Sequence, residues 1–383
     1  MRQSILVFSS SDWDGNWGSR QQIAERWAQR GHLVVFVEQM AGMEHFIKYP
    51  DLRQRRRRQI DVRRLQDRLW LLTPPVLLPG RYYFPLINYV NAQIVGRWLR
   101  RQLDDLAFIP TLLWCYKPEH AAVAAHWQDI ALVYHCIDEF SVGTHGWKRA
   151  NIIKQETDLL NRADVVFANS NLTYENKRRI NPQTYHIPSG ADVAHFKRAD
   201  NPKTTIPPLV ASLPSPIMMF VGNINEKINI SLLASVARER PEWTIVLIGQ
   251  VYGNADKQLQ KFDNVYCLGR QPFSQLPNFF RSADVCLLPY VESEVTRYRS
   301  PLKLYEYLAT GKPIVSTPHP EVKEFSDIIS IAPPEKFVSA IEDVLQHDNQ
   351  SARIKRFQIV SQHSWDVRVD QMESILQKRL TVW

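Results

Sequence analysis

Apolar runs typical of buried strands alternate with amphipathic, helix-like segments along the whole chain. In the first half, the run at 4–10 is followed by a helical pattern at 19–31 and a second apolar run at 32–39. This alternation predicts an α/β fold with mainly parallel sheets, because parallel strands need crossover connections. Further strand-like runs lie at 111–116, 130–138, 165–170, 184–187, 217–223, 244–250, 264–270, 285–290, 314–317 and 328–332.

Two series of strands and helices are separated by the segment from 197 to 216, which holds five prolines and few apolar positions. We expect this segment to be a linker. The chain then forms two doubly wound, Rossmann-like domains facing each other across a cleft, the first over 1–196 and the second over 217–363. Ligands of open α/β sheets bind beyond the carboxyl ends of the strands, so this cleft is the expected site. The amphipathic pattern at 364–383 predicts a final helix.

Length and composition agree with this organisation. The 383 residues suffice for two cores, and 44% hydrophobic with 22% charged residues is ordinary for a globular protein. We expect a cytoplasmic protein, because no apolar run reaches the ~18 residues of a membrane span and the N-terminus lacks a signal-peptide core. Each of the four cysteines falls within a strand-like run, which predicts buried free thiols rather than a metal cluster or disulfide framework.

The net charge of +8 suggests an anionic partner. Eight arginines and two aspartates lie between Arg53 and Arg68, followed by Trp70 and the proline-punctuated apolar stretch 71–86. A basic segment beside an aromatic and apolar one fits docking on an anionic membrane surface. The alternative is a solvated arginine-rich helix whose apolar side is ordinary core. No nucleic-acid-binding module surrounds the segment, which argues against nucleic acid as the partner.

The stretch SPLKLYEYLATGKPIVST, residues 300–317, predicts a helix with a charged face and then a strand. Ser300 fits the N-cap and Pro301 the first helical position. Lys303 and Glu306 project from the same side, and Gly311 ends the helix. An open helix N-terminus with a lysine attracts phosphate, and a glutamate one turn deeper accepts hydrogen bonds from sugar hydroxyls. The stretch therefore predicts a seat for a nucleotide diphosphate; the alternative is a solvated surface pair.

The run P-x-K-x-x-E-Y-L-A-x-G-K-P-x-V resembles the donor-binding signature of nucleotide-sugar glycosyltransferases with the GT-B fold, especially the retaining family 4 (group 1) enzymes. The resemblance is strongest over 220–322. In the first half, DWDGNWGSRQQIAERWAQRGHLVVFVE resembles the first loop and helix of bacterial polysaccharide glycosyltransferases, and RADVVFANSNLT and HIPSGADVAHF are also typical of them. The resemblance implies that the C-terminal helix (364–383) crosses back to pack on the first domain.

The same resemblance implies roles for residues of the second domain. Glu306 would hold the ribose, and Lys303 with the N–H groups after Ser300 would meet the diphosphate. The other candidate donor-binding residues are Thr296 and Arg297 for the donor sugar or phosphates, Gly222 and Lys227 beside the phosphates, and Gly269 and Arg270 at the base.

In the first domain, Asp138 closes a strand at the end of which the family resemblance implies an important polar residue, so it is the preferred candidate for sugar or acceptor contact and for a catalytic role. Glu139 and His135 are alternatives, although His135 fits a core histidine better because its neighbours are apolar. The resemblance also implies that the first β–α loop is the acceptor loop, where acceptor and donor phosphate meet. A tryptophan in this loop either stacks on a sugar ring or packs internally. The residues of this loop are Gly15, Trp17, Gly18 and Arg20.

Two positions depart from the family pattern. Tyr298 stands where many relatives have a glutamate, and Asn223 stands where many have an arginine. These departures fit a divergent branch and leave the identity of the donor sugar open.

The predicted activity is transfer of a sugar, such as a hexosyl group, from a nucleotide diphosphate sugar to the hydroxyl of a carbohydrate or lipid-linked acceptor. The resemblance implies cell-envelope or extracellular polysaccharide synthesis, retention of configuration, and no metal ion or resident cofactor. The expected place of action is the inner face of the plasma membrane, as a peripheral protein. The alternatives are a sugar-nucleotide epimerase of the same fold and a catalytically silent nucleotide-sugar-binding scaffold at the membrane.

Overall fold

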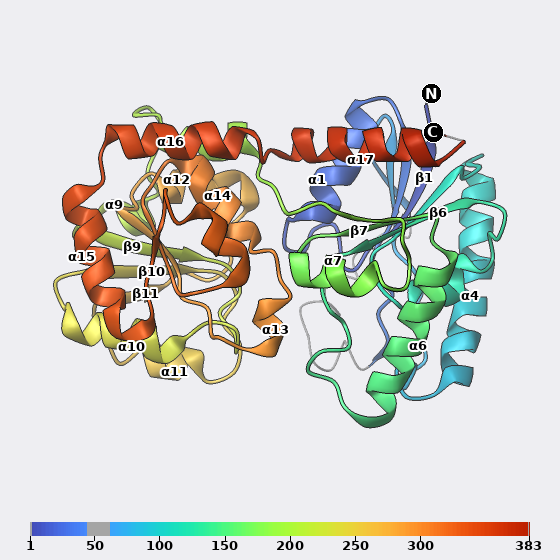
Figure 1. The fold of residues 1–383 in the computed structure, drawn as a ribbon, viewed down its shortest axis with the longest axis horizontal. Helices are drawn as coiled ribbons and strands as arrows, with labels where there is room; N and C mark the ends of the chain where they lie inside the picture. Colours follow the sequence, from blue (N-terminus) through green and yellow to red (C-terminus); the bar gives the residue numbers. More distant parts are fainter. Residues whose placement is uncertain (1, 44–61, 382) are drawn as a thin grey trace. The chain divides into compact units, whose positions relative to one another are not determined.

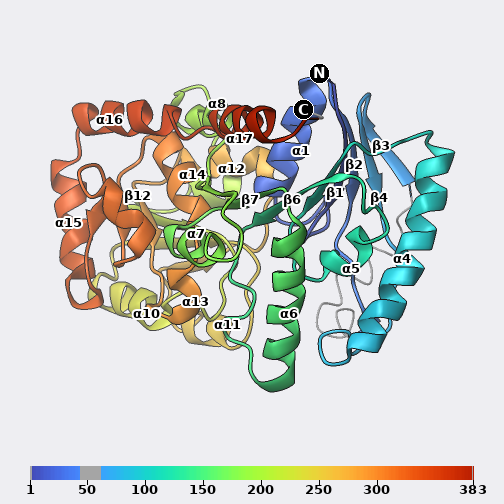
Figure 2. The same cartoon turned by 45° about the vertical axis from the view of Figure 1, so that its right-hand side comes forward.

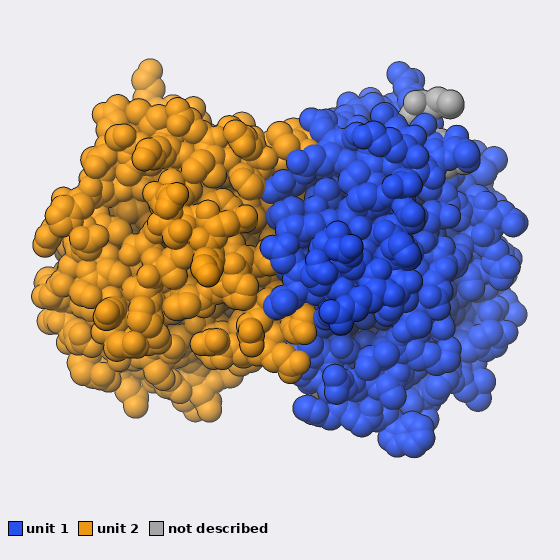
Figure 3. All heavy atoms as spheres, viewed as in Figure 1, with its two compact units in different colours: residues 1–188, 368–383 blue, residues 189–367 orange. Residues whose placement is uncertain are grey.

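The structure, a computed structural model, describes residues 2–43, 62–381 and 383 (Figure 1). It divides into two compact units (Figure 3). Unit 1 comprises Met1–Pro188 and Arg368–Trp383, and unit 2 comprises Ser189–Val367. The proline-rich segment 197–216, expected as a linker, belongs to unit 2, where Ala199 and Val210 are part of the hydrophobic core.

Unit 1 is built on one eight-stranded sheet with the order β3-β4-β2-β1-β5-β6-β7-β8. All neighbouring strands are parallel except the antiparallel pair β3 and β4. The predicted doubly wound, mainly parallel sheet is therefore confirmed. The strands are β1 (Ser4–Phe8), β2 (Leu33–Val37), β3 (Val62–Gln66), β4 (Leu69–Leu72), β5 (Leu112–Cys115), β6 (Ala131–Cys136), β7 (Val165–Ala168) and β8 (Thr184–His186).

The central strands of unit 1 are buried on both faces by its helices, as parallel sheets require. Trp27 of the first helix packs edge-to-face on Trp114 of β5, with ring centroids 4.5 Å apart. These helices are α1 (Ser19–Gln29), α4 (Pro85–Asp105), α5 (His120–Ala124), α6 (Gly146–Arg162) and α7 (Asn171–Lys177).

The last helix, α17 (Trp365–Arg379), starts in unit 2 and belongs to unit 1 from Arg368 onward (Figure 1). Arg30, at the end of α1, lies 2.7 Å from an Asp370 oxygen and 2.9 Å from a Glu373 oxygen. His32 stacks on Trp383 at 5.1 Å between centroids. The predicted return of the C-terminal helix to the first domain is thus confirmed.

Unit 2 has a six-stranded, fully parallel sheet with the order β11-β10-β9-β12-β13-β14. Its strands are β9 (Ile217–Val221), β10 (Thr244–Ile248), β11 (Val265–Cys267), β12 (Val285–Leu288), β13 (Ile314–Ser316) and β14 (Ser330–Ile331). Its helices are α8 (Val193–Lys197), α9 (Pro208–Ala211), α10 (Ile230–Glu239), α11 (Ala255–Leu259), α12 (Leu276–Phe280), α13 (Glu294–Arg297), α14 (Leu302–Thr310), α15 (Phe337–His347) and α16 (Gln350–Ser361). Four short 3₁₀ helices, η1 (Arg198–Asp200), η2 (Phe273–Gln275), η3 (Pro320–Phe325) and η4 (Pro334–Lys336), complete it.

The arginine-rich segment Arg53–Arg68 lies mostly outside the described residues, which resume at 62. Its described part does not support the arginine-rich helix, because Arg63 and Arg64 lie on strand β3. The guanidinium of Arg64 stands 5.3 Å from the ring centroid of Trp70 on β4. Among the described residues, no helix is both long and apolar enough to cross a membrane.

The four cysteines are free thiols, as predicted. Cys115, Cys136 and Cys286 are buried as predicted, but the predicted burial of Cys267 is wrong: it is half-buried, because β11 is an edge strand of the unit 2 sheet. Burial raises the pKa of Cys115 and Cys286 to about 12, so both stay protonated.

Candidate functional site

Helix α14 carries the two principal donor-site candidates, and it begins one residue later than the sequence pattern predicts. Pro301, in an extended conformation, is the N-cap, and the helix has no side-chain cap. The predicted N-cap Ser300 is therefore wrong, because its hydroxyl instead accepts a hydrogen bond from the backbone N–H of Ser189 at 3.1 Å. Gly311 ends the helix with φ of 74°, as predicted.

Lys303 and Glu306 form an ion pair on this helix. The Lys303 Nζ lies 2.8 Å from Glu306 Oε2, which confirms that the two side chains share one face. The Glu306 side chain is only 4% exposed, so the alternative of a solvated surface pair does not hold. A buried carboxylate needs charged or hydrogen-bonding partners, and Lys303 is one of them.

Three glycines follow neighbouring strands β9, β10 and β11 of unit 2. The N–H of Gly222 donates to Ile248 O at 2.8 Å, and the N–H of Gly249 donates to Gly269 O at 2.9 Å. A side chain at Gly222 would stand 3.5 Å from Cε of Lys303, so this turn lies directly beside the lysine.

The sequence pattern did not predict a role for Gly249, although its place at a strand end resembles that of the other two glycines. A Cβ atom there would overlap the carbonyl oxygen of Gly222. Gly249 is therefore required for the close approach of two adjacent turns.

The start of α14 and the glycine turns lie on one edge of the unit 2 sheet. Helix α14 connects the parallel strands β12 and β13, so its N-terminal end lies at the carboxyl ends of the strands. The turns at Gly222 and Gly269 follow the carboxyl ends of β9 and β11. This edge is where open α/β sheets bind ligands.

The other predicted donor-site residues of unit 2 have different surroundings. Thr296 is buried, and its hydroxyl donates to the carbonyl of Val291 at 2.7 Å, which holds the turn around α13. Arg297 and Arg270 are exposed on the surface of unit 2, and Lys227 is half-buried in the loop after β9. Lys303, Glu306 and Gly222 are the predicted residues that the structure brings together.

The charge of the Glu306 carboxylate affects the pKa of two further residues, His195 and Tyr290. Burial lowers the pKa of His195, and the Glu306 carboxylate partly opposes that shift. Burial also raises the pKa of Tyr290, and Glu306 adds to this effect. His195 stacks on Phe273 at 4.5 Å between centroids and makes a 2.9 Å hydrogen bond with its carbonyl. The pattern ADVAHF marked this loop, but it did not single out His195.

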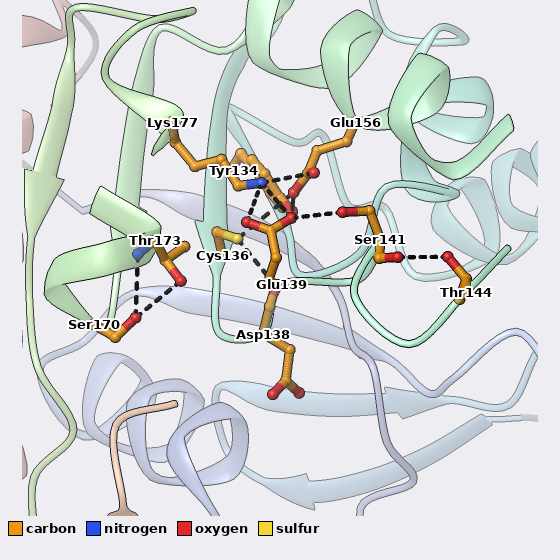
Figure 4. Close-up of polar contacts among 10 residues, drawn as sticks. All are labelled: Tyr134, Cys136, Asp138, Glu139, Ser141, Thr144, Glu156, Ser170, Thr173 and Lys177. Carbon is orange, nitrogen blue, oxygen red and sulfur yellow. Dashed lines mark hydrogen bonds and ion pairs between the residues drawn. The ribbon is translucent and has the colours of Figure 1, made fainter. Parts of the chain in front are cut away.

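In unit 1, Asp138 follows strand β6, and its side chain points away from a polar cluster formed by its neighbours (Figure 4). The thiol of Cys136 donates to the Asp138 carbonyl at 3.3 Å. The carboxylate of Glu139, by contrast, points into the cluster (Figure 4). Asp138 is therefore better placed than Glu139 to reach a ligand.

The cluster is centred on the ammonium group of Lys177. Its Nζ lies 2.8 Å from both carboxylate oxygens of Glu139 and 2.8 Å from Glu156 Oε2. The second oxygen of Glu156 accepts from the Tyr134 hydroxyl at 2.7 Å, and Ser141 donates to Glu139 at 3.2 Å. Burial disfavours a charged lysine, but the surrounding acidic groups raise the pKa of Lys177. The cluster thus fastens the loop after β6 to helices α6 and α7.

His135 behaves as the core histidine that the sequence suggests. It is buried against Trp114, Tyr116 and Phe167. Burial, assisted by the positive charge of Arg20, lowers the pKa of His135 to about 3, so the ring is neutral at physiological pH.

The predicted acceptor loop connects β1 to α1. Gly18 is the N-cap of α1, and its N–H donates to the side chain of Gln21 at 3.2 Å. Arg20 donates to the Ser11 hydroxyl at 2.9 Å. Trp17 packs edge-to-face on Trp13 at 5.2 Å, which supports internal packing. Gly15 closes a tight turn, with its N–H 3.2 Å from Asp12 O. Like Asp138, this loop lies at the carboxyl edge of the unit 1 sheet.

Comparison with known proteins shows that the chain is similar to glycosyltransferases. Residues 215–347 match the family described as Glycosyl transferases group 1. The chain is 23% identical over 274 residues to a putative teichuronic acid biosynthesis glycosyltransferase, TuaH, of Bacillus subtilis (strain 168). That alignment covers 66% of this chain and 68% of TuaH.

Several solved structures share the fold over nearly the whole chain. Sucrose-phosphate synthase from Thermosynechococcus elongatus has a TM-score of 0.72 at 16% identity, covering 98% of this chain and 99% of that one. The Anabaena protein HepE in complex with UDP-glucose has a TM-score of 0.68 at 15% identity, covering 98% and 100%. The catalytic domain of Arabidopsis thaliana starch synthase IV, bound to ADP and acarbose, has a TM-score of 0.67 at 10% identity, covering 99% of each chain.

Proposed function

We propose that this chain, which is a nucleotide-sugar glycosyltransferase of group 1 with the GT-B fold, transfers a sugar to a hydroxyl group in cell-envelope or extracellular polysaccharide synthesis. The observation that carries the donor assignment is the Lys303–Glu306 pair beside Gly222, at the carboxyl edge of the unit 2 sheet. It combines positive charge and a buried hydrogen-bond acceptor where α/β sheets take ligands.

In the proposed complex, the donor diphosphate lies at the start of α14. The first N–H groups of a helix lack partners within it, and the helix dipole favours negative charge there. Lys303 adds a full positive charge. Glu306, one turn deeper, accepts hydrogen bonds from the ribose hydroxyls. Gly222 leaves room for the phosphates, with Lys227 beside them, and Gly269 with Arg270 lies beside the base. Thr296 and Arg297 line the donor sugar or the phosphates.

The reaction breaks the bond between the anomeric carbon and the diphosphate. Negative charge grows on the leaving diphosphate while positive charge grows on the sugar ring. Lys303 and the α14 N–H groups are placed to stabilise the leaving group, which is the task that a metal ion performs in other transferases. We therefore propose transfer that continues in the presence of a chelator. We also propose retention of configuration at the anomeric carbon, on the basis of the family resemblance. Activity in the presence of EDTA tests the first proposal, and the stereochemistry of the product tests the second.

Asp138 is the proposed unit 1 residue for contact with the transferred sugar or the acceptor. Its carboxylate points away from the Lys177 cluster (Figure 4), and the loop that carries it is fastened by that cluster. A rigid loop keeps a reactive carboxylate in place. The acceptor loop of Gly15, Trp17, Gly18 and Arg20 lies at the same edge of this sheet.

The relatives suggest which donor and acceptor to try first. HepE is solved with UDP-glucose, and TuaH is described as acting in teichuronic acid biosynthesis. We propose a UDP-hexose donor and an acidic cell-wall or envelope polysaccharide acceptor, assembled at the inner face of the plasma membrane. The basic segment Arg53–Arg68 remains a proposed contact with an anionic membrane surface.

A two-part experiment tests the function. Thermal-shift screening of the wild type against UDP-, GDP-, ADP- and dTDP-sugars identifies the donor. Transfer of labelled sugar to envelope glycolipid extracts is then compared in wild type and Glu306→Ala. We expect stabilisation by one nucleotide class and loss of transfer in the variant. Near wild-type binding and transfer by Glu306→Ala would show that the site is assigned wrongly, and conversion of donor without acceptor would indicate an epimerase.

A further inference from the structure

We propose that unit 1 docks on an anionic bilayer through an apolar surface formed by residues 76–94 and the first turn of α6. This inference rests on the proposed function and specifies its acceptor class: a sugar acceptor anchored in the membrane. We call this surface the apolar rim. The described part of the chain has 17 large hydrophobic side chains that are exposed, and eight of them fall within the 19 residues of the first segment. They are Val76, Leu78, Tyr83, Phe84, Leu86, Tyr89, Val90 and Ile94.

The beginning of helix α4 is apolar on its outer side as well as its inner side. Leu86, which is 72% exposed, Val90 and Ile94 repeat at four-residue intervals on the outer side. Val95 and Leu99 of the same helix are fully buried in the core of unit 1. A helix that is hydrophobic all round is normally buried, so the outer side of α4 needs a covering partner.

The first turn of α6 joins the same surface. Trp147 is 84% exposed. The neighbouring Asn151 donates to the carbonyl of Tyr82 at 3.1 Å, and the Lys148 Nζ stands 5.6 Å from the Tyr82 ring centroid. These contacts tie the start of α6 to the loop that leads into α4. Tyrosine and tryptophan are the side chains that favour the interface between lipid and water.

The charges around the apolar rim favour an anionic bilayer over a protein partner. The sequence has no Asp or Glu between Arg68 and Leu103 or between Phe140 and Gln155. Exposed arginines follow the apolar part of α4, and basic residues follow Trp147 on α6. These are Arg97, Arg100, Arg101, Lys148, Arg149 and Lys154. Apolar and aromatic side chains that are followed along both helices by basic groups match a layer of acyl chains beneath anionic head groups.

The position of the apolar rim connects it to the acceptor. A crossover helix runs antiparallel to the strands it joins, so α4 and α6 both begin at the carboxyl edge of the unit 1 sheet. Both helices are seen to start at the same end of unit 1 (Figures 1 and 2). Asp138 and the loop from Gly15 to Arg20 lie at this edge. Docking through the apolar rim therefore turns the acceptor-side loops toward the bilayer, where a lipid-linked acceptor is held.

The test is co-sedimentation of the full chain with vesicles of pure phosphatidylcholine and of phosphatidylcholine with phosphatidylglycerol. The test variant is Leu86→Gln combined with Trp147→Ser. The matched control is Ile109→Ser, because Ile109 is 79% exposed and lies between α4 and β5, at the opposite edge of the same sheet. We expect wild type and the control to bind the anionic vesicles, and the double variant to bind at least about tenfold more weakly. Because the replaced side chains are exposed, all three proteins should have the same circular dichroism spectrum and nucleotide-sugar thermal shift.

Failure of wild type to bind either vesicle, or equal loss in Ile109→Ser and the double variant, would overturn the proposal. Self-association through the apolar rim would also overturn the proposal. In that case light scattering without vesicles would show wild type as an oligomer, and the double variant would lose this self-association but bind vesicles as well as wild type does. The thermal shift caused by the nucleotide sugar, here called the donor shift, separates this inference from the proposed function. Vesicle binding without any donor shift would contradict the glycosyltransferase assignment of the site, and a donor shift without vesicle binding would contradict the apolar rim alone.

Discussion

The side-chain nitrogen of Lys303 lies 2.8 Å from Oε2 of Glu306, one turn further along α14. The lysine side chain is 23% exposed, whereas the glutamate side chain is almost entirely buried. The pair therefore links the accessible start of the helix to an acceptor inside unit 2. In the proposed complex, ribose hydroxyls replace the lysine as donors to Glu306, and Lys303 turns to the diphosphate. On donor binding, the ion pair between Lys303 and Glu306 is thus replaced by a contact of each residue with the donor.

Lys303→Met is expected to weaken nucleoside diphosphate binding by about ten- to a hundredfold, because it removes a charge-assisted hydrogen bond to phosphate. Isothermal titration with the best nucleotide from the screen measures the change. Lys355→Met on α16 is the matched control, since Lys355 is exposed on the same unit and is also a helical lysine. Equal affinities in the two variants would contradict a phosphate role for Lys303.

Gly249→Ala is expected to destabilise unit 2 more than Gly253→Ala does. Both glycines have a positive φ, so each alanine carries a backbone cost of about 1–2 kcal/mol. The added Cβ at Gly253 meets open space, whereas at Gly249 it collides with the Gly222 carbonyl and must displace the turn beside Lys303. Urea unfolding measures stability, and donor titration should show weaker binding in Gly249→Ala alone. Similar unfolding free energies for the two variants would contradict the role of the glycine turns.

Lys177→Met is expected to lower the free energy of unfolding by about 3–5 kcal/mol, because it leaves the carboxylates of Glu139 and Glu156 buried without their cation. Lys154→Met is the control, since the Lys154–Asp158 pair on α6 is largely exposed and such pairs contribute about 0–1 kcal/mol. Urea unfolding followed by tryptophan fluorescence measures both. A loss below 1 kcal/mol for Lys177→Met would mean that the cluster does not hold the loop after β6.

His135→Phe is expected to make unfolding less sensitive to acid between pH 6.5 and 5. Burial lowers the pKa of native His135 to about 3 from an ordinary 6.5, so over this range the unfolded chain takes up a proton that the folded chain refuses. The contribution of neutral His135 to the free energy of unfolding is complete above pH 6.5. It decreases as the pH falls, by up to ~1.4 kcal/mol per pH unit for one such group. Urea unfolding at several pH values should show a shallower decline in the variant than in wild type. Parallel profiles for the two proteins would show that His135 is protonated in the fold.

The sequence pattern predicted the elements whose determinants are local. Strands β9 and β11 lie where the apolar runs before Gly222 and Gly269 predict them, and α14 ends at Gly311 as expected. Each of these features depends on residues that are neighbours along the chain. The hairpin of β3 and β4 was not predicted, because the arginines of β3 mask its alternation and suggested a basic helix.

Features that depend on distant segments were missed. The hydroxyl of Ser300 is used by Ser189, which lies 111 residues away along the chain, so the residue that looks like a cap serves a tertiary contact. The need for glycine at Gly249 arises from the backbone of a neighbouring strand, and that contact leaves no local pattern. The Lys177 cluster is likewise assembled from β6, α6 and α7.

The central claim is that Glu306 binds the ribose of the donor nucleotide. Titration of wild type and Glu306→Gln with UDP and with 2′,3′-dideoxy-UDP tests it most directly, or with the corresponding pair if the screen selects another base. We predict that wild type prefers the ribonucleotide by at least about tenfold, since a buried acceptor loses its hydrogen-bond donors in the dideoxy complex, and that Glu306→Gln loses most of this preference. An unchanged preference in Glu306→Gln would contradict the claim.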